Sequence, residues 1–283
     1  MSKYVFVNDF FLEDYVGGAE LTSESLINTC TSPILKIKSS DISESLIKEF
    51  KDSIWIFGNF SQMKAQFLMK FIKDKTNYHI IEYDFKFCQL RSPDKHIHLG
   101  DTCKCHTNYY GKLVSLFFSK SQCLWFMSHL QKKEYERRFP FLTKNSSHVL
   151  SSIFEPMLLQ EMIDSDVKKT NQWVILESNS WIKGMSDCVA FARDNNLPFR
   201  LVGGVSHEEM LKTLSESRGL IFLPRGGDTC PRIVIEAFLL GCDLKLNENV
   251  LHKDEPWFSK TKLDCVNYLK NRATFFWETL EDH

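Results

Sequence analysis

The sequence predicts an α/β protein of two domains, each a parallel sheet flanked by helices, and three observations support this fold class. Short runs rich in β-branched and aromatic residues alternate with segments of helical periodicity along almost the whole chain. The length of 283 residues exceeds one typical domain and suits two. A composition of 43% hydrophobic and 25% charged residues is that of an ordinary globular protein with material for two cores.

Ten short segments are predicted strands because apolar, β-branched and aromatic residues concentrate in them and turn-forming residues bound them. Six lie in the first half and four in the second, at residues 4–10, 33–39, 53–60, 78–84, 122–128, 147–153, 172–178, 198–204, 219–224 and 242–247. Between them, apolar residues recur at helical spacing, as in Phe67, Leu68, Phe71 and Ile72.

The connection between the domains is predicted at residues 154–172, where a segment with Pro156 and many acidic and lysine residues interrupts the alternation. This gives an N-terminal domain at 1–155 and a C-terminal domain at 156–283. Aromatic and aliphatic residues from 256 to 280 predict one or two closing helices, which we assign to the C-terminal domain.

Charge and end segments exclude several classes of protein. The formal net charge of −1 leaves no basic field to gather nucleic acid. The first residues lack the pattern of a signal peptide, and no apolar run approaches the length of a membrane span. Five of the nine cysteines stand singly among apolar residues, as core thiols do in a reducing compartment. These features predict a cytoplasmic protein. Basic amphipathic stretches at 64–75 and 132–138 allow peripheral membrane contact, or are solvated helix faces.

The most informative stretch runs from Leu223 to Gly241. Gly226 and Gly227 permit a tight turn and a close approach of backbone to a ligand, and Asp228 or Thr229 can cap the helix that follows. That helix is apolar on every face except for Glu236, whose buried carboxylate needs a partner. Hydroxyl groups of a ligand would satisfy it, and so would an arginine or a backbone group. For Asp228 the alternative to a ligand contact is a helix cap.

A second polar segment follows the predicted strand at 172–178. Lys183 and the N-terminus of the next helix would point at one place, and together they offset the charge of a diphosphate. The alternative is a solvated lysine. The strand at 198–204 ends in Gly203 and Gly204. Because ligands of open α/β sheets bind beyond the carboxyl ends of the strands, all these residues are candidates for one site.

The pair Asp228 and Glu236, separated by seven residues and followed by Ala237 and Gly241, resembles the motif of the retaining glycosyltransferases of family 4. That family usually has Glu at the first position. The resemblance implies the GT-B fold, in which two Rossmann-like domains face each other across a cleft. It also implies a UDP- or GDP-linked sugar as donor, a glycan or other acceptor, retention of configuration, and no metal ion or other cofactor.

The resemblance also implies roles for individual residues. Glu236 would bind the ribose hydroxyls, Asp228 the hydroxyls of the donor sugar, and Lys183 the diphosphate. The backbone near Gly203, Gly226, Gly227 and Thr229 would line the donor. In the N-terminal domain, Gly17 and Gly18 match the loop that reaches the donor diphosphate and the acceptor, and Asp84 ends a strand where the family places a polar residue that meets the reacting sugar or acceptor. Asp84, Lys183 and Asp228 are therefore the catalytic candidates. For Asp84 the alternative is a loop cap.

Cysteine and histidine residues gather between positions 88 and 106 in a way that the fold does not require. Cys88, Cys103, Cys105 and His106 have the chemistry of a structural zinc site, although their spacing matches no standard pattern. A disulfide and a loop of unpaired thiols are the alternatives.

Two other functions stay open beside the transferase. A nucleotide-sugar epimerase could share the fold. A non-catalytic module that binds nucleotide sugars or glycans would fit the aspartate at position 228, the absence of an arginine shortly before Lys183 and the short chain.

Overall fold

The structure is a computed structural model and describes residues 2–281. The chain forms two compact units, which we call unit 1 and unit 2. Unit 1 comprises residues up to Ile153 together with the last helix, and unit 2 comprises Phe154–Asn271. All ten predicted strands are present, and the predicted α/β class is confirmed.

Unit 1 contains a six-stranded, wholly parallel sheet in the order β2-β1-β3-β4-β5-β6. The strands are β1 Tyr4–Asn8, β2 Ile34–Lys38, β3 Ile54–Phe57, β4 Tyr78–Glu82, β5 Cys123–Phe126 and β6 Ser146–Val149. Its helices are α1 Gly18–Thr29, α2 Glu44–Glu49, α3 Ala65–Asp74, α4 Pro93–His98, α5 Tyr109–Ser119, α6 His129–Arg138 and α12 Arg272–Glu281, with short 3-10 helices η1 Ser39–Asp41, η2 Cys105–Thr107 and η3 Pro140–Lys144.

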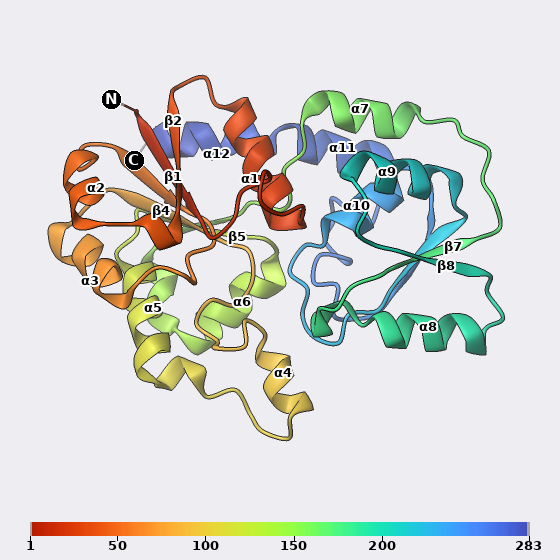
Figure 1. Ribbon diagram of the computed structural model, residues 1–283, viewed down its shortest axis with the longest axis horizontal. Coiled ribbons are helices and arrows are strands. Elements are labelled where there is room, and N and C mark those ends of the chain that lie inside the picture. Colours follow the sequence, from red (N-terminus) through yellow and green to blue (C-terminus); the bar gives the residue numbers. More distant parts are fainter. Residues whose placement is uncertain (1, 282–283) are drawn as a thin grey trace. The chain divides into compact units, whose positions relative to one another are not determined.

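The helices of unit 1 cover both faces of its sheet. Helices α1 and α12 pack together on one face, and α3 and α5 pack together on the other (Figure 1). Right-handed crossovers require this division, because the chain moves one way across the sheet from β1 to β2 and the other way afterwards. The central strands are consequently buried on both faces and contain continuous apolar runs, such as residues 4–7 of β1.

An aromatic cluster fills the core beneath α3 and α5. Phe57 of β3 contacts Phe71, Tyr78 and Phe117 edge to face, and Tyr78 stacks on Phe117 with 4.4 Å between ring centroids. All four rings are buried. Each buried ring contributes about 1.5–3 kcal/mol by transfer from water, so this cluster fixes α3 and α5 on the sheet.

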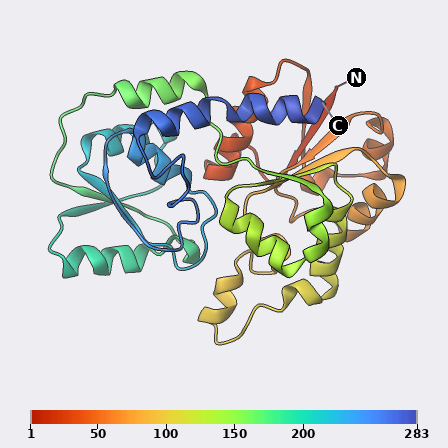
Figure 2. The same ribbon diagram turned by 180° about the vertical axis from the view of Figure 1, so that it is seen from behind.

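The last helix, α12, belongs to unit 1, whereas the closing helices were expected in the C-terminal domain. Trp277 lies 5.0 Å from Tyr4 between ring centroids, and its indole nitrogen donates to the carbonyl of Leu26. Phe276 packs on Trp125, and the Arg272 guanidinium donates to backbone carbonyls at the end of β6. The periodicity of the segment indicates a helix but not which sheet it covers. Figure 2 shows the same arrangement from behind.

Unit 2 contains a four-stranded parallel sheet in the order β10-β9-β7-β8. Its strands are β7 Trp173–Leu176, β8 Phe199–Val202, β9 Gly219–Phe222 and β10 Asp243–Leu246. Its helices are α7 Pro156–Asp164, α8 Met185–Asp194, α9 His207–Glu216, α10 Arg232–Leu239 and α11 Lys262–Lys270, with the 3-10 helix η4 Trp181–Lys183. Helix α8 covers one face, and its Cys188 and Ala192 pack on Trp173, Ile175 and Ile221 of the sheet. Helix α10 packs with α7 and α9 on the opposite face (Figure 1).

Each sheet has one place where the chain reverses its direction across the strands. In unit 1 this place lies between β1 and β3, and in unit 2 it lies between β7 and β9. The helices that follow such neighbouring strands diverge to opposite faces and leave a crevice beyond the carboxyl ends, where ligands of open α/β sheets bind. No helix within residues 2–281 has both the length and the apolar character needed to cross a membrane.

Candidate functional site

The site in unit 2 is built at the reversal point between β7 and β9. The loop after β7 carries Lys183 and the loop after β9 carries Asp228, which are two of the three catalytic candidates from the sequence. The Lys183 Nζ lies 2.7 Å from the Asp228 Oδ2, so the fold joins these two candidates in an ion pair. The lysine side chain is 29% exposed and the aspartate side chain 12%, which leaves the cation accessible while the acid is nearly buried.

Gly184 makes this juxtaposition possible. It ends η4 in the left-handed region at φ +61°, and a Cβ at this position would lie 2.0 Å from the carbonyl oxygen of Leu223. Both the backbone angle and the contact require glycine here. The loop after β7 therefore rests directly on the end of β9, which brings Lys183 to the neighbouring loop.

Further contacts join the two loops. The backbone N–H of Arg225 donates to the carbonyl of Ile182 at 3.0 Å, and the Arg225 guanidinium pairs with Asp187 at the start of α8. Because these contacts fix both ends of the Lys183 turn, the lysine is held by the scaffold and not only by its ion pair.

Asp228 is fixed through its backbone. Its N–H donates to the carbonyl of Asn249 at 2.8 Å, and its carbonyl accepts from the N–H of Leu251 at 3.0 Å, in a parallel bridge to Val250. Helix α10 begins only at Arg232, with Pro231 as its N-cap residue and no side-chain cap. Neither Asp228 nor Thr229 is therefore the N-cap residue of this helix.

Glu236 is buried in α10, as predicted, at 3% exposure. Its Oε1 accepts from the Arg232 Nε and contacts the His207 Nε2, both at 2.8 Å. Burial alone would raise the pKa of the Glu236 carboxyl, but His207 and Arg232 together lower it below its usual value. The carboxylate is therefore ionised and paired within the protein. An arginine partner was one of the alternatives to a ligand that the sequence left open.

His207 and Arg232 were not candidates from the sequence. Arg232 stands four residues before Glu236, a spacing that places two side chains on the same face of a helix, and this was the available signal. Its guanidinium also stacks 3.9 Å from the ring centroid of Phe154. His207 opens α9 after β8, and nothing local indicates that it faces α10.

The glycines of unit 2 differ in what they do. A Cβ on Gly203 would lie 2.5 Å from the carbonyl oxygen of Glu177, so this glycine lets the end of β8 pass close to the end of β7. Gly226 and Gly227 are buried in the loop before Asp228, and neither has a positive φ. The tight turn expected at Gly226 and Gly227 thus does not use the left-handed backbone that glycine favours.

In unit 1, Gly17 and Gly18 lie where β1 leads into α1. Gly17 is the N-cap residue of α1, and a Cβ there would lie 2.5 Å from the Glu20 Oε2 and 2.7 Å from the ring of Tyr15. Burial raises the pKa of the Glu20 carboxyl. The loop therefore lies against the carboxyl group of Glu20, the third residue of its own helix.

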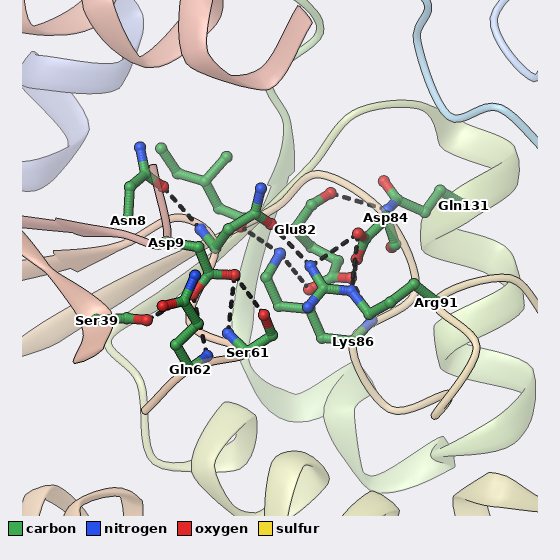
Figure 3. Close-up of polar contacts among 12 residues, drawn as sticks. Asn8, Asp9, Ser39, Ser61, Gln62, Glu82, Asp84, Lys86, Arg91 and Gln131 are labelled. Atoms are coloured by element: carbon green, nitrogen blue, oxygen red, sulfur yellow. Dashed lines mark hydrogen bonds and ion pairs between the residues drawn. The ribbon is translucent and has the colours of Figure 1, made fainter. Parts of the chain in front are cut away.

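A polar network occupies the carboxyl ends of β1, β3 and β4 (Figure 3). Asp9, directly after β1, accepts from Ser39, from the hydroxyl and N–H of Ser61, and from the N–H of Gln62. Burial alone would raise the pKa of the Asp9 carboxyl, but these hydrogen bonds lower it. Asp9 therefore ties the loops of three elements together at the reversal point of unit 1.

Asp84, the third catalytic candidate, lies in the same network. Both of its carboxylate oxygens accept from the Arg91 Nε, at 2.9 and 2.8 Å, and Arg91 also donates to the Asn59 Oδ1 (Figure 3). Beside it, Glu82 and Lys86 form a fully buried pair at 3.1 Å. Asp84 is 33% exposed, so a paired acid remains accessible at this sheet edge.

The cysteine-rich segment brings together three of its four predicted ligands. Cys88, Cys103 and Cys105 lie side by side, and the fourth group is His96 instead of His106. The His106 ring turns to Arg138 and Phe139.

Comparison with known proteins adds the fold family. No family profile matches the chain, and no curated protein matches it. Several solved structures do match. HepE of Anabaena in complex with UDP and glucose matches at TM-score 0.60 and 9% identity over 100% of both chains. The glycosyltransferase AviGT4 of avilamycin A biosynthesis matches at TM-score 0.52 and 8% identity over 98% of this chain and 93% of its own. The lipopolysaccharide outer core galactosyltransferase WaaB matches at TM-score 0.50 and 10% identity over 96% and 90%. The chain thus has the predicted GT-B fold.

Proposed function

We propose that this protein is a glycosyltransferase that moves a sugar from a nucleotide-sugar donor to an acceptor, with retention of configuration. The observation that carries the proposal is the Lys183–Asp228 pair at the reversal point of unit 2. The likeness to HepE, solved with UDP-glucose and with UDP and glucose, supports a UDP-linked donor over a GDP-linked one.

Lys183 has the chemistry to bind the donor diphosphate. Its ammonium group is the accessible partner of the pair and stands on the first turn before α8. A diphosphate arriving there would gain a charge-assisted hydrogen bond and the partial positive charge of the helix N-terminus. As the bond between the sugar and the diphosphate breaks, negative charge grows on the leaving group, and the ammonium stabilises that charge most in the transition state.

Asp228 would then accept hydroxyl groups of the donor sugar. Its ion pair with Lys183 keeps the carboxylate beside the proposed diphosphate position. The donor sugar is bonded to the diphosphate, so it would lie next to the carboxylate. The buried backbone around Gly226, Gly227 and Thr229 would line the donor on the same side.

The Glu236 carboxylate could have either of two roles. In the first, Arg232 and His207 hold Oε1 and keep the carboxylate ionised, while Oε2 accepts a ribose hydroxyl. In the second, Glu236 only secures α10 to α9. We propose the first, because two partners on one oxygen leave the other as the natural acceptor.

Unit 1 would bind the acceptor, with Asp84 beside the acceptor hydroxyl and Gly17 and Gly18 near the reacting groups. The bidentate pair with Arg91 supports this placement, since it holds the Asp84 carboxylate in one orientation at the sheet edge. In this proposal the reaction needs no metal ion, because Lys183 supplies the positive charge at the diphosphate.

The test is a product analysis with UDP-linked and GDP-linked sugars and a panel of glycan acceptors. A transferase releases nucleoside diphosphate and yields a new glycoside whose anomeric configuration matches the donor. Isomerised donor would favour an epimerase of the same fold. Binding without any product, across donors and acceptors, would favour a non-catalytic module.

A further inference from the structure

We propose that Cys88, His96, Cys103 and Cys105 form a structural zinc site in unit 1. The four residues come from separate parts of the segment between β4 and α5. Cys88 follows the end of β4, His96 lies on α4, Cys103 lies in the loop after α4, and Cys105 begins η2. The segment folds back on itself, so that the four side chains converge on one point.

The distances among the four side chains are those of a tetrahedral zinc site. The Cys88 Sγ and the Cys103 Sγ are 3.7 Å apart, and the His96 Nε2 lies 3.4 Å from the sulfurs of both Cys88 and Cys105. All four atoms lie within 4.8 Å of one another. Zinc bonds of about 2.3 Å to sulfur and about 2.0–2.1 Å to nitrogen give tetrahedral edges of about 3.8 Å and 3.5 Å. The side chains thus surround a space of the correct size for this ion.

The surroundings of the cluster suit thiolates bound to a cation. The three cysteines are buried. The Arg138 guanidinium donates to the carbonyl of Cys103. A site of three thiolates and zinc carries a net charge of −1, and the Arg138 guanidinium, which also pairs with Glu134, is a cation beside it.

A disulfide between Cys88 and Cys103 explains the positions of the four side chains less well than a zinc ion does. A sulfur separation of 3.7 Å is well above a bond of about 2.05 Å. Joining Cys88 to Cys103 would leave Cys105 and His96 pointing at the same place without a role. Because four protein ligands fill the tetrahedron, no position stays open for a reacting water, and the zinc would be structural.

The zinc would hold the segment that carries Arg91, the partner of Asp84. Arg91 follows Cys88 by three residues, and its N–H donates to the Cys88 carbonyl. At the other end, a Cβ on Gly111 of α5 would lie 2.0 Å from the carbonyl oxygen of Cys105, so η2 rests directly on α5. One ion would therefore fix both ends of a segment that contains little regular structure.

Metal analysis of the purified chain, produced with zinc in the medium, tests the site independently of any transferase activity. We expect about one zinc ion per chain, released by a thiol-blocking mercurial. Replacement of zinc by Co²⁺ should give intense visible bands of tetrahedral cobalt with thiolate charge transfer. A protein that binds neither ion, with its thiols titrating freely, would overturn the proposal.

Matched variants distinguish the ligands from their neighbours. His96→Ala and Cys103→Ser should lose the zinc or change the cobalt spectrum, whereas His106→Ala and Cys30→Ser should keep both. Retention of an unchanged cobalt spectrum in His96→Ala, or its loss in His106→Ala, contradicts the assignment. If the cysteine variants fail to fold, limited proteolysis of the wild-type protein decides. With a chelator present, trypsin should then cleave faster after Lys95 and Lys104, and unchanged cleavage in a metal-stripped protein would count against a structural role.

Discussion

The Lys183 Nζ and the Asp228 Oδ2 lie 2.7 Å apart, although 45 positions separate the two residues in the sequence. The neighbouring positions of β7 and β9 bring them together, and Gly184 lets one loop rest on the other. A cation that is accessible beside an acid that is nearly buried offers a binding position for a diphosphate joined to a hydroxyl-rich group.

Asp228→Asn should separate sugar recognition from diphosphate binding. The variant loses the charge that is proposed to hold the sugar hydroxyls, so we expect turnover of the nucleotide sugar to fall about 100-fold, because hydrogen bonds to charged groups contribute about 1.5–3 kcal/mol. The affinity for UDP itself should stay within about threefold, since Lys183 is retained. Turnover assays and calorimetry measure the two effects. Equal turnover in variant and wild type would remove Asp228 from the site.

Glu236 can be tested with the ligand as well as with a variant. If Glu236 binds ribose, UDP should bind the wild-type protein at least about tenfold more tightly than its 2′,3′-dideoxy analogue. In Glu236→Gln this difference should shrink, while binding of inorganic pyrophosphate stays the same. Equal affinity of the wild type for both nucleotides would instead assign Glu236 to the contact between α9 and α10 alone.

Gly184→Ala should strongly destabilise unit 2. Its Cβ would meet the Leu223 carbonyl at 2.0 Å in addition to the strain of φ +61°, so we expect a loss of about 3 kcal/mol or more. Gly204→Ala is the matched control, because φ is +66° there but the Cβ would enter open space, and the loss should be about 1–2 kcal/mol. Urea unfolding followed by tryptophan fluorescence compares them. Equal losses would mean that the close contact contributes nothing.

We expect the stability of unit 2 to depend on pH through His252. The ring is fully buried between Trp257 and Phe258, and burial lowers the pKa of His252 to about 3. The unfolded chain takes up this proton near pH 6.5, whereas the folded chain does so only near the lowered pKa. The stability present above pH 6.5 is therefore lost as pH falls towards 3, by about 2 kcal/mol at about pH 5.

The variant His252→Phe checks this origin. Urea unfolding at about pH 7.5 and pH 5 should show a smaller loss of stability in the variant than in the wild type, because phenylalanine takes up no proton. An identical loss in both proteins would assign the pH dependence to other groups.

The strands were predictable because most are short runs rich in apolar, β-branched and aromatic residues between turn residues, and β1 and β7 are typical of them. The order of the strands was not, since no local pattern states which strands become neighbours. The sequence therefore assigned Lys183 and Asp228 to one site but did not predict their ion pair, which depends on the sheet order.

The remaining differences have similar causes. His207 reaches Glu236 only because α9 and α10 pack on the same face of the sheet. His106 follows Cys105 directly in the sequence, but its ring lies against Arg138 and Phe139, and His96 on α4 takes its place. Local sequence spacing shows which residue types a segment contains, whereas the fold determines which of these side chains come into contact.

Calorimetric titration of the full chain with UDP tests the central claim most directly. Lys183 is the proposed diphosphate ligand, and Lys212, an exposed lysine on α9, is the matched control. We expect UDP to bind the wild type and Lys212→Ala equally, and Lys183→Ala at least about tenfold more weakly. Equal affinity in all three proteins, or no binding of UDP or GDP to any of them, would contradict the account.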